Sequence, residues 1–132
     1  MNVFEQRRAE FAAALRSGKY TQGKYMLKRR TKTSVYHCVW GVGCEIYKEH
    51  HPDTSNWEDA LFNYGDVDKA EMFSVGDGYT FKTSPPTEVR DYFGFTDKAV
   101  RTMMSRNDQM VSSFSGLADF VESYKGNWYA GN

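Results

Sequence analysis

The stretch VYHCVWGVGCEIYKEHH, residues 35–51, contains both cysteines and all three histidines of the 132-residue chain. Its first six residues are rich in strand-forming types, and the apolar residues from Trp40 to Tyr47 recur at helical spacing. We therefore predict that a strand over residues 35–40 passes into a core helix over residues 41–50.

The thiols and imidazoles of this stretch raise the question of a metal or thiol site. Cys38 and Cys44 are six positions apart, whereas zinc sites favour tight pairs such as C-x₂-C. If residues 35–40 form a strand, His37 and Cys38 point to opposite faces. We therefore predict that the cysteines are free thiols in a core, and that the protein holds no metal and no cofactor.

The sequence before this stretch predicts a helix and then a strand. Apolar residues at helical spacing favour a helix over residues 3–16, which Gly18 ends. Residues 24–30 alternate and are rich in strand formers. After a polar turn they pair with residues 35–40, which predicts an antiparallel hairpin.

The second half of the chain predicts a loop, two short strands and three helices. Residues 52–69 are polar and acidic and favour a long loop, with Trp57, Leu61 and Phe62 as its anchors. Residues 70–83 predict two strands joined at a GDG turn. The three helices are recognised by Pro86 at the start of the first, Thr96 as the N-cap of the second, and the apolar stripe of the third: Phe114, Leu117, Phe120, Val121 and Tyr124.

Together these elements predict a single α+β domain over residues 1–132. An N-terminal helix leads, a small antiparallel sheet of two to four strands follows, and a helical C-terminal half closes the core. No apolar run approaches the 18 residues of a membrane span, and the N-terminus lacks the apolar segment of a signal peptide. We therefore expect a cytoplasmic protein without a membrane partner.

The net charge is zero, but its distribution is uneven. Residues 1–33 carry nine Lys and Arg against two acids, which gives +7, and the remainder carries −7. A basic arm on an acidic body indicates an anionic partner or a head-to-tail contact between copies, which would make a homo-oligomer. A solvated face packed against the protein's own acidic half explains the same pattern, so the charge alone leaves the partner open.

The basic, aromatic hairpin is the candidate partner surface, because mixtures of cations and rings bind phosphates and stack bases. Strand alternation places Lys24, Lys28 and Arg30 on one face, which we predict to be exposed together with Tyr36 as ligand-binding residues. Arg29 falls on the opposite face, which we predict to be apolar, with its guanidinium paired to an acid.

A second candidate group, Arg106, Asn107 and Asp108, lies between two predicted helices. Asn and Asp are common at caps and turns, so these residues either complete a turn or line a pocket for a small polar ligand. The last two helices suggest a helix-turn-helix, but residues 114–123 contain no Lys or Arg to face phosphates. We therefore do not expect DNA binding by the last helix.

Four segments of the chain, in this order, carry a resemblance to a known family: ALRSGKYTQGKYMLKR, YHCVWGVGCEIY, PPTEVRDYFGF and MMSRNDQMVSSFSGLADFVES. They resemble small proteins encoded by tailed phages and some bacteria, whose pattern runs AL-SGKY-Q, CCLGVLC, LP--V--WLGL and L--MND-G-SF-EIADFIE. The chain departs from this pattern at Val39, which replaces the middle cysteine, and in RNDQM, which keeps Asn107 and Asp108 but loses the glycine.

The resemblance implies a phage or prophage accessory protein and no particular chemistry. We expect a non-catalytic protein of the host cytoplasm that acts in counter-defence or host takeover. Its partner would be an anionic small molecule of the nucleotide type or an acidic host protein. Two alternatives stay open: a small enzyme that acts on a nucleotide or peptide through Cys38 or His37, and a nucleic-acid-binding protein that uses the basic hairpin.

Overall fold

Helices and one mixed sheet make up the structure, a computed structural model that describes residues 1–60 and 68–125. The helices are α1 (Val3–Arg16), α2 (Val39–His50), α3 (Thr87–Phe93), α4 (Asp97–Asp108) and α5 (Phe114–Ser123). The strands are β1 (Thr21–Gln22), β2 (Lys28–Thr31), β3 (Val35–His37), β4 (Ser55–Asp59) and β5 (Asp68–Val75). The predicted α+β class is confirmed, with its leading helix, small sheet and helical C-terminal half.

The sheet has the order β1-β3-β2-β5-β4 in the described residues. The predicted hairpin is present, because β2 and β3 pair antiparallel. Strand β1 pairs parallel with β3, so the sheet is mixed rather than purely antiparallel. The parallel pair consists of only two residues on each strand, and so short a strand leaves no alternation in the sequence to predict it.

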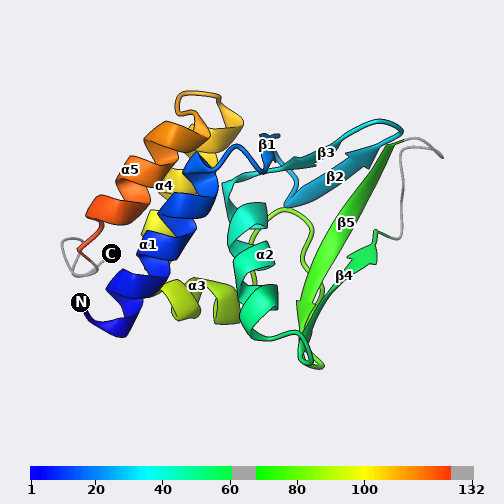
Figure 1. The fold of residues 1–132 in the computed structure, drawn as a ribbon. Helices are drawn as coiled ribbons and strands as arrows, with labels where there is room; N and C mark the ends of the chain where they lie inside the picture. The colour runs from blue at the N-terminus through cyan, green and yellow to red at the C-terminus, as the bar shows by residue number, and fades with distance from the viewer. Residues whose placement is uncertain (61–67, 126–132) are drawn as a thin grey trace.

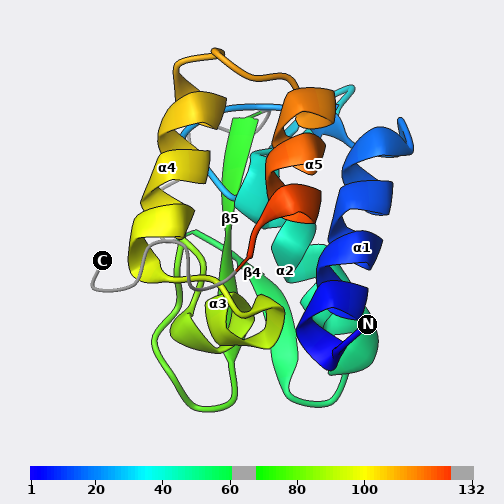
Figure 2. The same cartoon turned by 90° about the vertical axis from the view of Figure 1, so that its left-hand side faces the viewer.

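The elements form layers around α2 (Figure 1). Helix α2 lies between the sheet and the group of α1, α4 and α5, while α3 lies across the lower end of α1 and α2 in this view. The turned view shows α4, α5 and α1 running along one side of the molecule (Figure 2). Helix α2 is therefore covered from both sides, which explains why its residues from Val39 to Cys44 are all buried.

Trp40 lies at the centre of the core and is completely buried. Its ring makes edge contacts with Phe11 of α1 at 5.3 Å and with Phe95 at 5.5 Å between ring centroids. A Cβ at Gly41 would lie 1.7 Å from the carbonyl oxygen of Leu27, so only glycine lets α2 approach the chain that enters β2. The glycines that weaken this helix in isolation are thus required by its packing.

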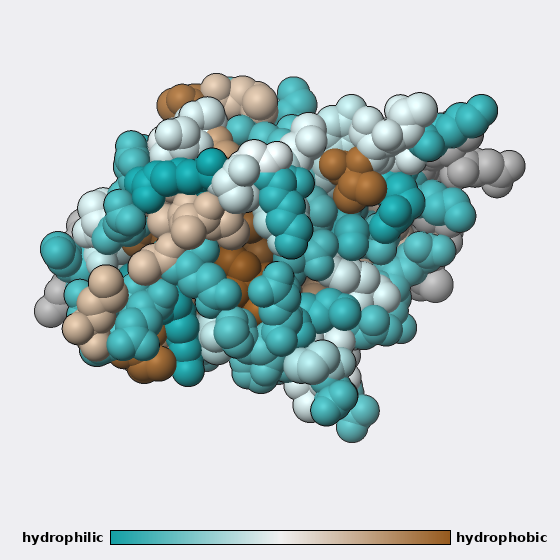
Figure 3. All heavy atoms as spheres, viewed as in Figure 1, coloured by the Kyte–Doolittle hydropathy of each residue, from teal (hydrophilic) through white to brown (hydrophobic). Residues whose placement is uncertain are grey.

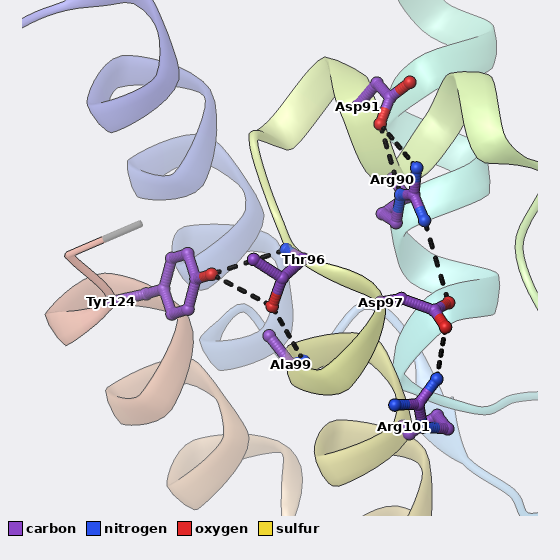
Figure 4. Close-up of polar contacts among 7 residues, drawn as sticks. All are labelled: Arg90, Asp91, Thr96, Asp97, Ala99, Arg101 and Tyr124. Carbon is purple, nitrogen blue, oxygen red and sulfur yellow. Dashed lines mark hydrogen bonds and ion pairs between the residues drawn. The ribbon is translucent and has the colours of Figure 1, made fainter. Parts of the chain in front are cut away.

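Helix α4 begins as the sequence predicts, with Thr96 as its N-cap. The Thr96 hydroxyl accepts the backbone N–H of Ala99 at 3.1 Å, and the Tyr124 hydroxyl lies 3.3 Å from both the hydroxyl and the N–H of Thr96 (Figure 4). Asp97 next to it pairs with Arg90 and Arg101. The junction therefore ties α3, α4 and the residue after α5 together.

Four predicted boundaries are wrong. Strand β2 starts at Lys28 rather than at residue 24, because Tyr25 has a φ of 73°, which no strand residue adopts. Strand β3 ends at His37, because α2 already begins at Val39. The predicted loop over 52–69 contains β4, which forms by pairing with β5. The second strand of the predicted pair at 70–83 is reduced to a single bridge between Phe73 and Phe81.

Two smaller points complete the comparison with the predictions. Pro86 is the N-cap of α3 rather than its first residue. The predicted anchors Leu61 and Phe62 lie outside the described residues, whereas Trp57 lies in β4 and packs on Phe73 with ring centroids 4.8 Å apart.

Candidate binding site at the hairpin

A hollow of about 390 Å³ opens between the β1–β2 loop, the outer face of the β2–β3 hairpin and the α4–α5 loop. We call it the hairpin pocket. Its volume lies in the range of about 300–1,000 Å³ that is typical of small-molecule sites. The lining residues in the described part of the chain are Gln22, Gly23, Lys24, Tyr25, Met26, Arg29, Tyr36 and Met110.

Gln22 fastens one wall of the pocket to the α4–α5 loop. Its side-chain N–H₂ donates to the carbonyl of Ser112 and to the amide oxygen of Asn107, both at 3.0 Å. Its amide oxygen accepts the backbone N–H of Phe114 at 3.0 Å. Both the nitrogen and the oxygen of the Gln22 amide therefore make hydrogen bonds that hold the wall.

Asn107 supports the pocket from behind and is completely buried. Its amide oxygen accepts the N–H of Val39, the first residue of α2, at 3.1 Å, in addition to the bond from Gln22. Its amide nitrogen donates to the carbonyl of Gly23 at 2.9 Å. Asn107 therefore lies behind the pocket and holds its wall, and it is not among the lining residues.

Two non-glycine residues at the pocket have positive φ angles: 73° at Tyr25 and 55° at Met110. The N–H of Tyr25 donates to the Asp108 carboxylate at 2.7 Å, which holds the loop in this conformation. Met110 stands where the resembled pattern has its glycine. Both side chains are more than half exposed, so the core does not require them. Strain of this kind clusters at ligand-binding sites.

The pocket is cationic and lined by aromatic rings. Lys24 and Arg29 are its charged residues, and the described lining includes no acid. The guanidinium of Arg29 lies 5.1 Å from the centre of the Tyr36 ring, and the Lys24 ammonium lies 5.5 Å from that of Tyr25. Such an arrangement suits an anion that carries a planar ring.

The predicted exposure of Lys28 is wrong. Its side chain is 12% exposed, with the ammonium 3.2 Å from a carboxylate oxygen of Glu45. Arg30 is half exposed and pairs with Glu71 at 3.2 Å. Arg29, predicted to lie on the apolar face, lines the pocket instead. The register explains both errors, because it pairs Arg29 with Tyr36 on one face and Lys28 with Glu71 on the face that α2 covers.

Of the predicted site residues, the structure therefore brings Lys24 and Tyr36 together in the pocket, with Asn107 and Asp108 behind it. Arg106 lies elsewhere, with its guanidinium 5.6 Å from the centre of the Phe120 ring, beside a shallow hollow that it shares with Lys98 and Arg101. The other lining residues were not predicted as site residues, because the turn at Tyr25 and the approach of the α4–α5 loop bring them together: Gln22, Gly23, Tyr25, Met26, Arg29 and Met110.

Glu45 is the centre of a second polar group between α2 and the sheet. Its carboxylate accepts from His37 at 2.8 Å and from the Trp57 indole at 2.9 Å, in addition to the ion pair with Lys28. Burial alone would raise the pKa of Glu45, but the bond from His37, the charge of Lys28 and the bond from Trp57 outweigh it and lower the pKa to about 2. The Glu45 carboxylate is thus bound by three side chains of the protein itself, which indicates a structural role.

Cys38 and Cys44 are free and buried, as predicted. Burial raises the pKa of the Cys38 thiol to about 12, so it is protonated at neutral pH and is a poor nucleophile. Within residues 1–60 and 68–125, no three His, Cys, Asp or Glu side chains gather as a metal site would require.

Figure 3 shows a largely hydrophilic surface on which hydrophobic atoms form small separate patches. One patch covers the loop between α4 and α5, where Met110 and Val111 are exposed by 54% and 70%. None of the helices in the described ranges is long and apolar enough to cross a membrane.

The fold and the pocket define a small α+β protein with a cationic, ring-lined pocket on its hairpin. The chain belongs to the family DUF8296, a domain of unknown function, whose model matches residues 4–125. Comparisons with curated proteins and with solved structures found no match.

Proposed function

We propose that this protein binds an anionic partner in the hairpin pocket and does not catalyse a reaction. The observation that carries the proposal is the pairing of two cations, Lys24 and Arg29, with two rings, Tyr25 and Tyr36, in a pocket whose described lining has no acid. The partner is a nucleotide-type small molecule or an acidic host protein. The biological setting, a phage accessory protein in counter-defence or host takeover, rests on the resemblance in sequence.

The alternatives receive less support from the side chains they would use. An enzyme acting through Cys38 needs a thiolate, and burial keeps this thiol protonated. His37, its partner in that alternative, has Nε2 engaged by Glu45. A nucleic-acid surface made by the other face of the hairpin would need Lys28, whose ammonium is held by Glu45.

The proposal is tested by a search for bound small molecules and by a charge reversal. Purified protein is heated, and the supernatant is analysed by mass spectrometry for an anionic compound. The compound found, or an acidic protein captured from host extract, is then titrated against the wild type, Lys24→Glu and Lys32→Glu. Both lysines are exposed, Lys24 in the β1–β2 loop and Lys32 in the turn between β2 and β3, and of the two only Lys24 lines the pocket.

We expect Lys24→Glu to weaken binding by at least about tenfold, equivalent to about 1.4 kcal/mol, and Lys32→Glu to change it far less. Equal effects of the two reversals, or a partner whose binding neither variant changes, would contradict a site in this pocket. Unfolding curves of all three proteins show whether the variants stay folded.

A further inference from the structure

We infer that the hairpin pocket receives an acidic, apolar segment of another protein, with one carboxylate beside Lys24 and a neighbouring apolar side chain packed on the α4–α5 loop. This inference rests on the proposed function and chooses between its two kinds of partner. It also adds a feature that the proposed function lacks, an apolar contact next to the charged part of the pocket. The apolar surface, the charge of the pocket and the positions of the other lysines each support it.

The surface around the pocket contains exposed apolar side chains. Met26 and Met110 belong to the lining together with the Tyr25 ring. Tyr25 and Met110 are exposed by 57% and 54%, and Val111, the residue after Met110, is exposed by 70%. Figure 3 shows this apolar patch over the α4–α5 loop. An exposed apolar patch beside a pocket marks an interaction surface, and flexible methionine side chains adapt to partners of different shape.

The backbone presents two of these side chains in a strained conformation. Tyr25 and Met110 have φ angles of 73° and 55°, and they are the two non-glycine residues with positive φ in residues 1–60 and 68–125. The N–H of Tyr25 donates to the Asp108 carboxylate at 2.7 Å, which fixes the loop. Glycine would adopt these angles without strain, but it would present no side chain to the pocket. The strained backbone therefore favours a role for both side chains in binding.

The charge of the pocket matches a carboxylate better than a phosphate. Lys24 is exposed, and its ammonium lies 5.5 Å from the centre of the Tyr25 ring. Arg29 is engaged within the protein, where its guanidinium lies 5.1 Å from the centre of the Tyr36 ring, so it forms part of the pocket wall. One ammonium balances the single negative charge of an Asp or Glu side chain, whereas a phosphate monoester carries about −1.5 to −2 at pH 7.

The other two exposed lysines of residues 1–33 do not extend this site. Lys19 lines a different hollow, in which Glu45 and Glu49 supply carboxylates. Lys32 follows the end of β2 and Lys24 precedes its start, so the four residues of β2, about 13 Å in length, lie between them. A nucleic-acid strand gains affinity from a row of cations along its phosphates. Lysines at three separate places favour a short protein segment that uses Lys24 alone.

A random heptapeptide library, selected on the purified full chain at about 0.15 M salt, tests the chemistry of the partner. We expect the selected peptides to share an Asp or Glu beside an apolar or aromatic residue. The tightest peptide is then titrated by calorimetry. It is compared with a version in which its acids are replaced by the matching amides and with a version in which its apolar residue is replaced by Ser. Each version should bind at least about tenfold more weakly.

Protein variants test the charge and the apolar contact separately. Lys24→Glu and Met110→Asn should each weaken binding of the selected peptide by at least about tenfold, and Asn tolerates the positive φ of position 110. The controls for charge are Lys19→Glu and Lys32→Glu, and the control for the apolar change is Val3→Asn, at an exposed position of α1. Each control should change the affinity by less than about threefold, because salt screens charges more than about 8 Å apart. Thermal unfolding shows whether every variant is folded.

Several results would overturn the inference. If no peptide is selected while an anionic small molecule released by heat binds and Lys24→Glu abolishes its binding, the inference fails and the proposed function stands. A selected peptide that depends on Lys24 but not on Met110 has the same consequence. Peptides without acids, whose affinity Lys24→Glu leaves unchanged, contradict both proposals, and so does the absence of any anionic ligand.

Two further results would assign the surface to a different partner. An oligothymidine strand that binds more tightly than the best peptide, and that loses affinity equally in Lys19→Glu, Lys24→Glu and Lys32→Glu, would indicate nucleic-acid binding. Self-association of the protein alone in analytical ultracentrifugation, abolished by Lys24→Glu, would place a second copy of the chain in the pocket. Either result refutes a segment of another protein as the occupant.

Discussion

The amide oxygen of Asn107 on α4 accepts the N–H of Val39, the first residue of α2, at 3.1 Å. The N–H of a first helical residue has no acceptor within its own helix, so a residue from another helix satisfies this buried donor. The same amide holds Gln22 and Gly23 at the pocket. The side chain of Asn107 therefore stabilises both the start of α2 in the core and the wall of the pocket.

Asn107→Ala should therefore lower the free energy of unfolding by about 3 kcal/mol, because it leaves the buried N–H of Val39 and the carbonyl of Gly23 without partners. Urea denaturation followed by circular dichroism measures the change. Asn56→Ala, at an exposed position of β4, is the matched control and should change stability by less than about 0.5 kcal/mol. A similar, small effect at both positions would show that the network contributes little.

Gly41→Ala should prevent or strongly impair folding, with a loss of more than about 3 kcal/mol, because the new Cβ would collide with the backbone carbonyl of Leu27. Gly116→Ala in α5 is the control, since the nearest atom to its Cβ is 3.5 Å away. There alanine should stabilise by up to about 1 kcal/mol through its higher helix propensity. Thermal unfolding of the two variants tests the contrast, and equal melting temperatures would refute the close approach of α2 to Leu27.

Trp40→Phe should change stability by no more than about 1 kcal/mol, because the buried indole N–H of Trp40 has no hydrogen-bond partner among residues 1–60 and 68–125, and its loss offsets the smaller ring. Trp57→Phe should cost more, about 1.5–3 kcal/mol, because it removes a hydrogen bond to the Glu45 carboxylate. Chemical denaturation of both variants gives the comparison. The reverse order would mean that the Trp40 N–H has a partner in solution.

Glu45 should make the protein sensitive to acid. The folded-state pKa of about 2 lies below the ordinary value of 4.5, so the stabilisation by this carboxylate is complete above pH 4.5 and is lost as the pH falls toward 2. Glu45→Gln should therefore be less stable than the wild type at pH 7, and the difference should shrink below pH 4.5. Unfolding curves at a series of pH values test this, with the exposed Glu49→Gln on the same helix as control. A difference that stays constant with pH would contradict the role of the Glu45 charge.

Tyr25→Gly should separate binding from stability. Glycine adopts a φ of 73° without strain, so the free energy of unfolding should stay constant or rise by up to about 1 kcal/mol. The affinity for the anionic partner of the hairpin pocket should fall by at least about tenfold, because the exposed ring that lines the pocket is gone. Calorimetric titration and thermal unfolding of the same sample give both numbers. Tyr79→Gly, at an exposed ring outside the pocket lining, should leave the affinity unchanged.

The sequence predicts those elements whose signals are local. The helix over residues 3–16 and the cap at Thr96 follow from propensity and capping chemistry within a few positions. Strand β4, with the sequence SNWED, has one strong strand former and becomes a strand through its pairing with β5. A strand that forms through pairing with a distant segment cannot be recognised from its own residues alone.

The candidate site was predictable in composition but not in orientation. The cations and rings of the hairpin point to an anionic partner, and Lys24 and Tyr36 do line the pocket. The face assigned to Lys28 depends on the position at which alternation begins, and the turn at Tyr25 shifts that position. The acids that pair with Lys28 come from α2 and β5, which are distant in the sequence. The sequence alone therefore could not show that the Lys28 ammonium forms ion pairs within the protein.

The packing of α1 along α5 has a consequence for synthesis on the ribosome. Arg16 and its partner Asp119 are 103 positions apart, which at about 5–20 residues per second corresponds to about 5–20 s of translation. During that interval α1 lacks its packing against α5, and a nascent chain with an uncovered apolar face is prone to chaperone binding or self-association. We therefore expect folding to finish only after α5 has left the exit tunnel.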